Sequence, residues 1–269
     1  MSVQPKIGLA LGGGFFRGLA HIGVLRVLED NNIAVHMICG TSIGAVVGSV
    51  YACGMPLKRL EQLAVSVNER MFYDLGIPRK GMLRGDKITD FMRTVTGNRD
   101  FDQTDIPFRA VACDIETGEK LVLSQGKIYQ AVRASLSVPG VFVPVEMDGR
   151  VMVDGGVVCR VPSQETRAMG ADVVIAVDVG ARQGRFEVSN TLDIIVRTFE
   201  IMEYQAMRGT EDADVIITPQ VNHINMTRLT QAAECVDLGV QAALSALPDI
   251  KKAVQKAARR VKRVNAPKD

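Results

Sequence analysis

This sequence has few of the residues that build metal centres or disulfide frameworks. Its five cysteines are an odd number, they are widely spaced, and no two of them form a Cys-x-x-Cys pair. The five are Cys39, Cys53, Cys113, Cys159 and Cys235, and most of them lie inside apolar stretches. This pattern argues against a metal cluster and against a disulfide scaffold, so we expect buried free thiols in a reducing compartment.

Long apolar runs and a strong excess of one charge are also missing. No run approaches the roughly 18 residues of a membrane-spanning helix. Residues 1–6 are too short and polar to begin a secretory signal, and the apolar run after them breaks at Gly12. The net charge of +2 gives no reason to expect a nucleic-acid partner. We therefore expect a cytoplasmic, soluble protein.

Predicted strands and helices alternate along the chain. Apolar runs predict strands at residues 7–11, 35–39, 108–114, 120–124, 151–153, 172–179 and 214–218. Helical spacing predicts helices at residues 19–30, 43–53, 57–69, 86–96, 128–137, 162–169, 192–208 and 232–247. Such an alternation over 269 residues predicts one large α/β domain, with a mostly parallel sheet and helices on both faces.

Two segments differ from this alternation. Residues 71–105 are irregular and rich in glycine. They could form a cap that covers a site or an ordinary long excursion of the chain. We favour the cap, because an apolar substrate would need cover. From Ile250 onward there are eight Lys or Arg and one acidic residue. Residues 250–264 have helical spacing, which predicts either a basic helix resting on anionic lipid or a helix docked on the body by a thin apolar stripe. The small residues of that stripe favour docking.

Ser42 lies in the run Gly40-Thr41-Ser42-Ile43-Gly44, between a predicted strand and a predicted helix. A nucleophile elbow has this context, because a sharp turn exposes the serine hydroxyl and the glycines on either side relieve crowding. The helix that begins after Ser42 would direct its N-terminal dipole at negative charge forming there.

A glycine-rich loop at residues 12–18 joins the first predicted strand to the first predicted helix. Its backbone N–H groups could hold an oxyanion or a phosphate, or the glycines could merely allow the helix to pack closely. The spacing fits neither a P-loop nor G-x-G-x-x-G. An oxyanion loop after the first strand and an elbow after the second fit together, because neighbouring parallel strands end at the same edge of a sheet.

A nucleophilic serine needs a proton acceptor. The only histidines are His21, His36 and His223, and His223 alone lies late in a loop, as a Ser-His-Asp hydrolase would need. The other candidate is Asp154, in Asp154-Gly155-Gly156 at the end of a predicted strand. It would have to be desolvated, with a raised pKa, and held against the serine hydroxyl. By itself, Asp-Gly-Gly is more often a simple turn.

Four segments together resemble the patatin-like phospholipase family, and in detail its short bacterial members related to the catalytic domain of neuropathy target esterase. They are the loop ending in Arg17-Gly18, the block at residues 19–25, the Gly40–Gly44 elbow and the Asp154-Gly155-Gly156 turn. They stand in the family's order and cover roughly residues 7–180. Each is weak alone, and the combination is highly specific.

This resemblance implies a three-layer α/β/α patatin-like fold, with a catalytic domain at residues 1–249 and a basic C-terminal helix and tail at residues 250–269. It implies a Ser-Asp dyad, with Ser42 as nucleophile and Asp154 as base, and an oxyanion hole made by the N–H groups of Gly13 and Gly14. The implied reaction is hydrolysis of lipid acyl esters through an acyl-serine, with no metal and no cofactor.

The loop departs from the family pattern at Phe15, where a small residue is usual. A left-handed backbone there would be unfavourable for phenylalanine. An alternative is therefore a catalytically weak or inactive adaptor that binds another protein, although nothing in the sequence indicates a protein partner. Arg17 matches the family's basic residue, and we favour a loop-anchoring role over an anion-binding one. Peripheral contact with an anionic membrane would use the basic helix.

Overall fold

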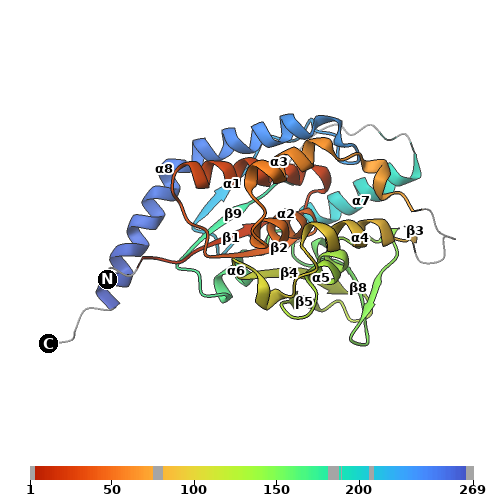
Figure 1. Cartoon of the computed structure of the whole chain (residues 1–269), viewed down its shortest axis with the longest axis horizontal. Coiled ribbons are helices and arrows are strands. Elements are labelled where there is room, and N and C mark those ends of the chain that lie inside the picture. Colours follow the sequence, from red (N-terminus) through yellow and green to blue (C-terminus); the bar gives the residue numbers. More distant parts are fainter. Residues whose placement is uncertain (1–3, 75–80, 181–187, 189, 206–208, 265–269) are drawn as a thin grey trace.

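The computed structural model describes residues 4–74, 81–180, 188, 190–205 and 209–264. An eight-stranded sheet forms its centre, in the order β10-β9-β1-β2-β4-β8-β7 with β5 also paired to β4 (Figure 1). The strands are β1 (Ile7–Leu11), β2 (Met37–Thr41), β4 (Phe108–Asp114), β5 (Lys120–Leu123), β7 (Val145–Met147), β8 (Arg150–Asp154), β9 (Val173–Val177) and β10 (Val215–Ile217). A small second sheet pairs β3 (Gly81–Leu83) with β6 (Gly140–Phe142).

The five strands from β10 to β4 run parallel, whereas β5, β7 and β8 join by antiparallel pairing. This confirms the mostly parallel sheet predicted from the sequence. The first two strands are direct neighbours, with Ala10 opposite Cys39 and Leu11 opposite Gly40. The glycine loop and the elbow therefore leave the same edge of the sheet, as predicted.

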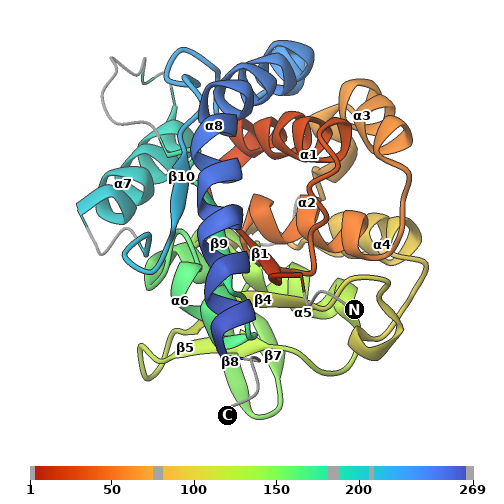
Figure 2. The ribbon, with the colours of Figure 1, turned by 90° about the vertical axis from the view of Figure 1, so that its left-hand side faces the viewer.

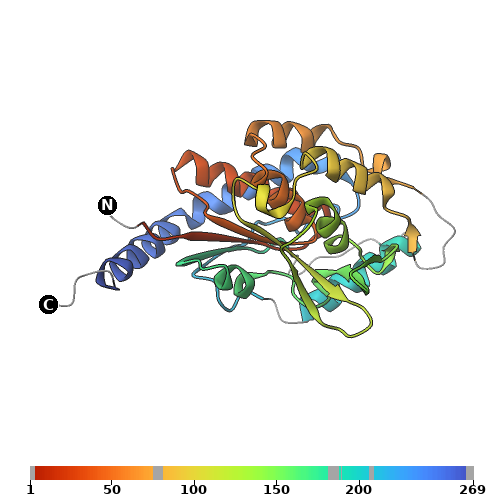
Figure 3. The same cartoon turned by 60° about the horizontal axis from the view of Figure 1, so that its bottom comes forward.

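Helices cover both faces of the sheet, which confirms the three-layer fold (Figure 3). Leu9 and Leu11 point into the larger core under α1 (Ala20–Asp30), α2 (Ile43–Ala52) and α8 (Ala232–Val264), whereas Ala10 points into a smaller core on the other face, near α6 (Ser163–Ala168). This alternation is the two-residue period of a strand that is buried on both faces. The remaining helices are α3 (Leu57–Ser66), α4 (Asp86–Val95), α5 (Ile128–Ser135) and α7 (Thr191–Gln205).

Helix α8 is continuous through Pro248, where the sequence predicted two separate helices. Proline removes one helical hydrogen bond and bends the axis, and α8 is bent between its two halves (Figures 1 and 2). The carbonyl group that loses its partner belongs to Leu244, which is 52% exposed, so water can satisfy it. Ala243 and Ile250, on either side of the proline, both pack into the main core. The predicted boundary between residues 249 and 250 therefore falls inside one helix, whose apolar stripe is docked on the body.

Short strands and exact boundaries account for most other differences from the sequence prediction. Strands β3, β6 and β7 have three residues each, too few to show an alternating pattern. Strand β2 begins and ends two residues later than predicted, so Ser42 follows the strand directly. Of the predicted cap at residues 71–105, residues 75–80 lie outside the described chain.

Helices α1 and α8 cross at two glycines. A Cβ atom on Gly23 would lie 2.0 Å from the carbonyl oxygen of Val236, and one on Gly239 would lie 2.0 Å from that of Ala20. No side chain fits at either point without separating the helix backbones.

We predict that Gly23→Ala lowers the free energy of unfolding by about 1–3 kcal/mol, because overpacking outweighs the better helix propensity of alanine. Urea denaturation followed by circular dichroism would measure the change. Ser245→Ala, at an exposed position of α8, is the control and should stay within about 0.5 kcal/mol of the parent. A Gly23→Ala protein at least as stable as the parent would show that the two helices can separate without loss.

Candidate active site

Ser42 occupies a strained turn between β2 and α2. Its backbone angles are φ 54° and ψ −124°, a region that residues other than glycine rarely adopt. The neighbouring glycines make the turn possible. A Cβ atom on Gly40 would lie 2.6 Å from the backbone of Ala45, and one on Gly44 would lie 2.1 Å from the Leu11 carbonyl oxygen. The segment is thus built as a nucleophile elbow.

Asp154 is the last residue of β8 and lies against Ser42. The Ser42 hydroxyl donates a hydrogen bond of 2.6 Å to Asp154 Oδ2, and the Gly156 N–H donates one of 2.8 Å to Oδ1. Strand β4 explains this meeting, because its consecutive residues Val111 and Ala112 pair with Thr41 and Asp154 respectively. The two side chains therefore leave strands on either side of β4 at the same level.

Burial changes the acidity of this carboxyl group. Asp154 is fully buried, and the loss of water raises its pKa from an ordinary value to about 7. The hydrogen bonds from Ser42 and Gly156 favour the charged form and offset part of this rise. The group is therefore poised to exchange a proton near neutral pH.

Two serines near the end of α5 support the pair, and the sequence analysis did not find them. The Ser42 N–H donates to Ser135 Oγ, and the Ser135 hydroxyl donates in turn to the Val111 carbonyl. The Asp154 N–H donates to the carbonyl of Ser137. No spacing in the sequence signalled these roles, because each partner lies far away along the chain.

The glycine loop is held by backbone contacts, and these correct one prediction. The Gly13 N–H donates a 3.0 Å hydrogen bond to the carbonyl of Arg160, so it is not available to an oxyanion. The Gly14 N–H has no hydrogen-bond partner among the described residues. The same holds within the described chain for the N–H of Ile43, the first residue of α2. The available donors near Ser42 are therefore Gly14 and Ile43 in place of Gly13 and Gly14.

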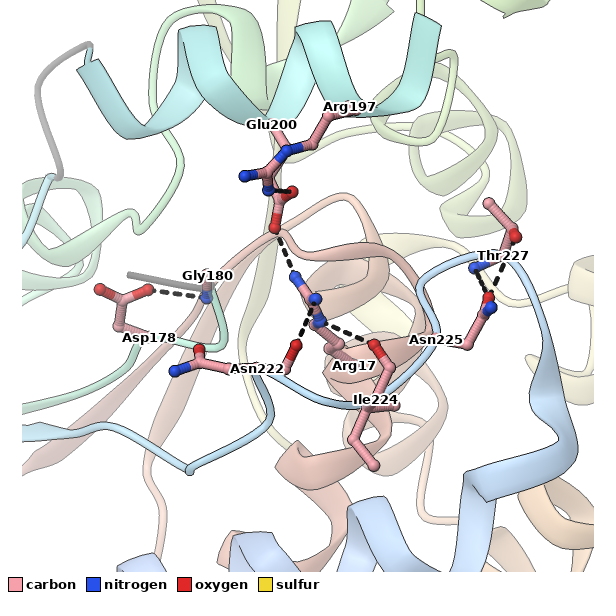
Figure 4. A network of polar contacts seen from close by, with 9 residues as sticks. All are labelled: Arg17, Asp178, Gly180, Arg197, Glu200, Asn222, Ile224, Asn225 and Thr227. Atoms are coloured by element: carbon pink, nitrogen blue, oxygen red, sulfur yellow. Dashed lines mark hydrogen bonds and ion pairs between the residues drawn. The ribbon is translucent and has the colours of Figure 1, made fainter. Parts of the chain in front are cut away.

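Arg17 ties the glycine loop to two distant segments (Figure 4). Its buried guanidinium donates to the carbonyls of Asn222 and Ile224 and pairs with Glu200 of α7. Burial lowers its pKa, and the pairing with Glu200 opposes that shift. Since its three nitrogens have protein partners, these contacts fit the loop-anchoring interpretation.

Phe15 adopts the left-handed backbone that the sequence analysis regarded as unfavourable, with φ 52°. For a residue other than glycine this costs about 1–2 kcal/mol. Its ring packs edge-on against Phe199 of α7, with 6.3 Å between ring centroids, and forms part of a cavity wall beside Ser42. Aromatic contact thus offsets some of the strain.

The histidines have other partners. His21 is buried and donates from Nε2 to the Gly12 carbonyl, and burial lowers its pKa to about 4, so it stays neutral. His36 Nδ1 accepts the N–H of Ile7, and exposed His223 pairs with Glu234. Since all three histidines are described and none is hydrogen-bonded to Ser42, the structure gives no support to a Ser-His-Asp triad.

An apolar cavity of about 200 Å³ opens beside Ser42. Helices α2, α3 and α4 and the start of α7 contribute to its walls. The predicted cap segment supplies part of the lining, including Phe72, Tyr73, Leu83, Ile88 and Phe91. Such a cavity can hold a hydrocarbon chain while the ester lies at Ser42.

The described chain offers neither a metal site nor a membrane-spanning helix. Across the described ranges, histidine, cysteine, aspartate and glutamate side chains form no group of three able to hold a metal ion. All five cysteines are buried and free, as predicted. No helix of the described chain combines the length and the apolar character that crossing a bilayer requires.

Comparisons with known proteins identify the family to which the chain is similar. The family model for patatin-like phospholipase matches residues 9–165. An uncharacterized NTE family protein of Mycobacterium bovis is 38% identical over 185 residues, which cover 68% of this chain and 51% of that protein. Mouse patatin-like phospholipase domain-containing protein 7 is 35% identical over 190 residues, or 68% of this chain and 14% of that protein. The chain thus matches about half, or much less, of these relatives' length.

Solved structures share the fold at low sequence identity. VipD from Legionella pneumophila superposes with a TM-score of 0.60 and 13% identity, covering 91% of this chain and 67% of that one. ExoU of Pseudomonas aeruginosa, solved with SpcU, gives a TM-score of 0.53 and 14% identity, covering 94% of this chain and 54% of that one.

The raised pKa of Asp154 leads to a prediction on stability. The folded protein keeps a proton on Asp154 up to about pH 7, whereas the unfolded chain releases it near pH 4. The parent should therefore lose stability relative to Asp154→Asn as pH rises through this interval, by on the order of 1–4 kcal/mol. Denaturation of both proteins at several pH values measures the difference, in which the other titrating groups cancel. A constant difference would mean that Asp154 has an ordinary pKa.

Proposed function

Because this chain belongs to the patatin-like phospholipase family, we propose that it hydrolyses acyl esters of lipids, with Ser42 as nucleophile and Asp154 as general base. One observation supports these roles above all. The Ser42 hydroxyl donates a 2.6 Å hydrogen bond to a buried carboxylate whose pKa is raised to about 7. A base of that pKa can accept the serine proton during attack and return it afterwards.

The reaction begins as Ser42 Oγ attacks the ester carbonyl and Asp154 Oδ2 takes its proton. The tetrahedral intermediate carries a negative oxygen, which the N–H groups of Gly14 and Ile43 and the N-terminus of α2 stabilise. As the intermediate collapses, the proton passes from Asp154 to the departing alcohol oxygen and leaves an acyl-serine. A water molecule then attacks the acyl group while Asp154 accepts its proton, and collapse restores the Ser42 hydroxyl and releases the fatty acid.

The hydrogen bonds around the pair would keep this geometry during turnover. Ser135 holds the backbone of Ser42, Ser137 holds that of Asp154, and Gly156 fixes the second carboxylate oxygen. Asp154 can therefore move its proton without reorienting, which is the advantage of a preorganised site.

We predict that Ser42→Ala and Asp154→Asn each lower kcat/KM for acyl esters at least about 10³-fold, because each removes one half of the proton transfer. His223→Ala, at an exposed site, is the control and should retain close to parental turnover. Loss of activity in His223→Ala with retention in Asp154→Asn would instead favour a histidine base.

A fluorophosphonate probe distinguishes this enzyme from the adaptor suggested by Phe15. Parent protein should be labelled at Ser42 and Ser42→Ala should not. Folded parent protein that resists the probe would contradict the proposed function and favour the adaptor.

A peripheral membrane contact through α8 remains a prediction of the same proposal. The C-terminal half of α8 extends beyond the sheet (Figure 1) and exposes Lys251, Lys252, Lys256 and Arg259. Binding to anionic phosphatidylglycerol vesicles should exceed binding to neutral phosphatidylcholine vesicles and weaken as salt is raised. Lys252→Glu combined with Lys256→Glu should reduce it in vesicle co-sedimentation. Equal binding to both kinds of vesicle would contradict the contact.

A further inference from the structure

The cavity beside Ser42 runs along one face of helix α2. Ser42, Val46, Val47 and Val50 all line it, at helical spacings that place them on adjoining turns of one face. Cys53, the next position of this face in the described chain, does not line the cavity. The floor of this arm of the cavity therefore begins at the nucleophile and ends at Val50.

Two neighbouring helices contribute only part of their length to the lining. Helix α1 contributes Ile22 but not Leu25, and α3 contributes Leu60 but not Leu57, although all four are described. Ile22 and Val50 are at most 2% exposed and Leu60 is 5% exposed. Each of these three side chains lines the cavity from a buried position, and buried side chains in a packed core cannot yield without strain.

The lining has the chemistry of a hydrocarbon site. Among the lining residues that the structure describes, only Ser42, Tyr73 and Thr227 have a polar side chain, and none is charged. An acyl chain gains from leaving water here, whereas a charged head group would lose its hydration without a partner.

The length of the arm follows from helix geometry. Eight residues separate Ser42 from Val50, and a helix rises about 1.5 Å per residue, so the arm extends about 12 Å. A zigzag chain with bonds of about 1.5 Å advances roughly 1.25 Å per carbon. The arm therefore matches about eight to ten carbons.

On the basis of the proposed function, we propose that this protein selects medium-chain acyl groups, and that Val50 sets the length limit from the end of the α2 arm. Longer chains would have to bend or leave carbon atoms outside. Chain length, more than the head group, would then determine which esters react.

The test measures kcat/KM on p-nitrophenyl esters from acetate to palmitate. The parent should gain roughly fourfold per added CH₂ up to octanoate or decanoate and then stop gaining. In Val50→Phe the decanoate-to-butyrate ratio should fall at least about tenfold, because the larger ring fills the end of the arm. In Val50→Ala the optimum should move to longer chains.

The matched control is Val65→Phe, because Val65 is an exposed residue of α3 outside the cavity lining. Its chain-length profile should equal that of the parent. Fluorophosphonate labelling of Ser42 checks that each variant retains a formed site.

Two outcomes would overturn the inference. One is a parental profile that keeps rising through palmitate, and the other is a profile that Val50→Phe leaves unchanged, which would place the acyl chain in the part of the cavity under α7. Absence of Ser42-dependent hydrolysis on every ester would contradict the proposed function itself, so the two failures are distinguishable.

Discussion

The site depends on one constraint, a carboxylate kept without water and within 2.6 Å of a serine hydroxyl that comes from the other side of a strand. Ser42 and Asp154 flank β4, and the glycines of both turns let the chain pass close to its neighbours. Gly155 approaches so closely that a Cβ atom there would lie 2.3 Å from the Val111 carbonyl oxygen. Burial of Asp154 opposes folding when the group is charged, and that same burial brings its pKa close to neutral pH.

Backbone groups, more than charged partners, hold this arrangement in place. Even the buried, charged Arg133 has no acidic hydrogen-bond partner among these contacts. Its guanidinium donates to the backbone carbonyls of Arg84, Gly85 and Val143 and to the hydroxyl of Ser137. It thereby joins the segment before α4 to the residue whose carbonyl receives the Asp154 N–H. Burial lowers the pKa of Arg133 to about 10, which leaves it charged at neutral pH. Arg133 thus links the segment before α4, which helps to cover the cavity, to Ser137, which supports Asp154.

The features that were predicted correctly from the sequence are those that residues close together in the chain determine. The elbow at Ser42, the parallel pairing of β1 with β2 and the alternation of strands and helices all follow from neighbouring residues, and they were predicted correctly. The error over Gly13 has a different origin. Its N–H is used by the Arg160 carbonyl, a contact that only the folded chain creates. The predicted break between residues 247 and 250 has a similar origin, because the packing of Ala243 and Ile250 that keeps α8 continuous has no local signal.

If the two proposals above hold, helix α2 links the chemistry to the choice of acyl chain. In the proposed mechanism its first N–H groups would stabilise the oxyanion, and its side chains Val46, Val47 and Val50 line the cavity in which the acyl chain would lie. One rigid element would therefore fix both the position of the carbonyl and the direction of the chain. An acyl group too long for the arm would lift its carbonyl away from these amides instead of merely binding less well. Since an oxyanion contact acts only if it is short in the transition state, the penalty on such substrates would fall on kcat as well as on KM.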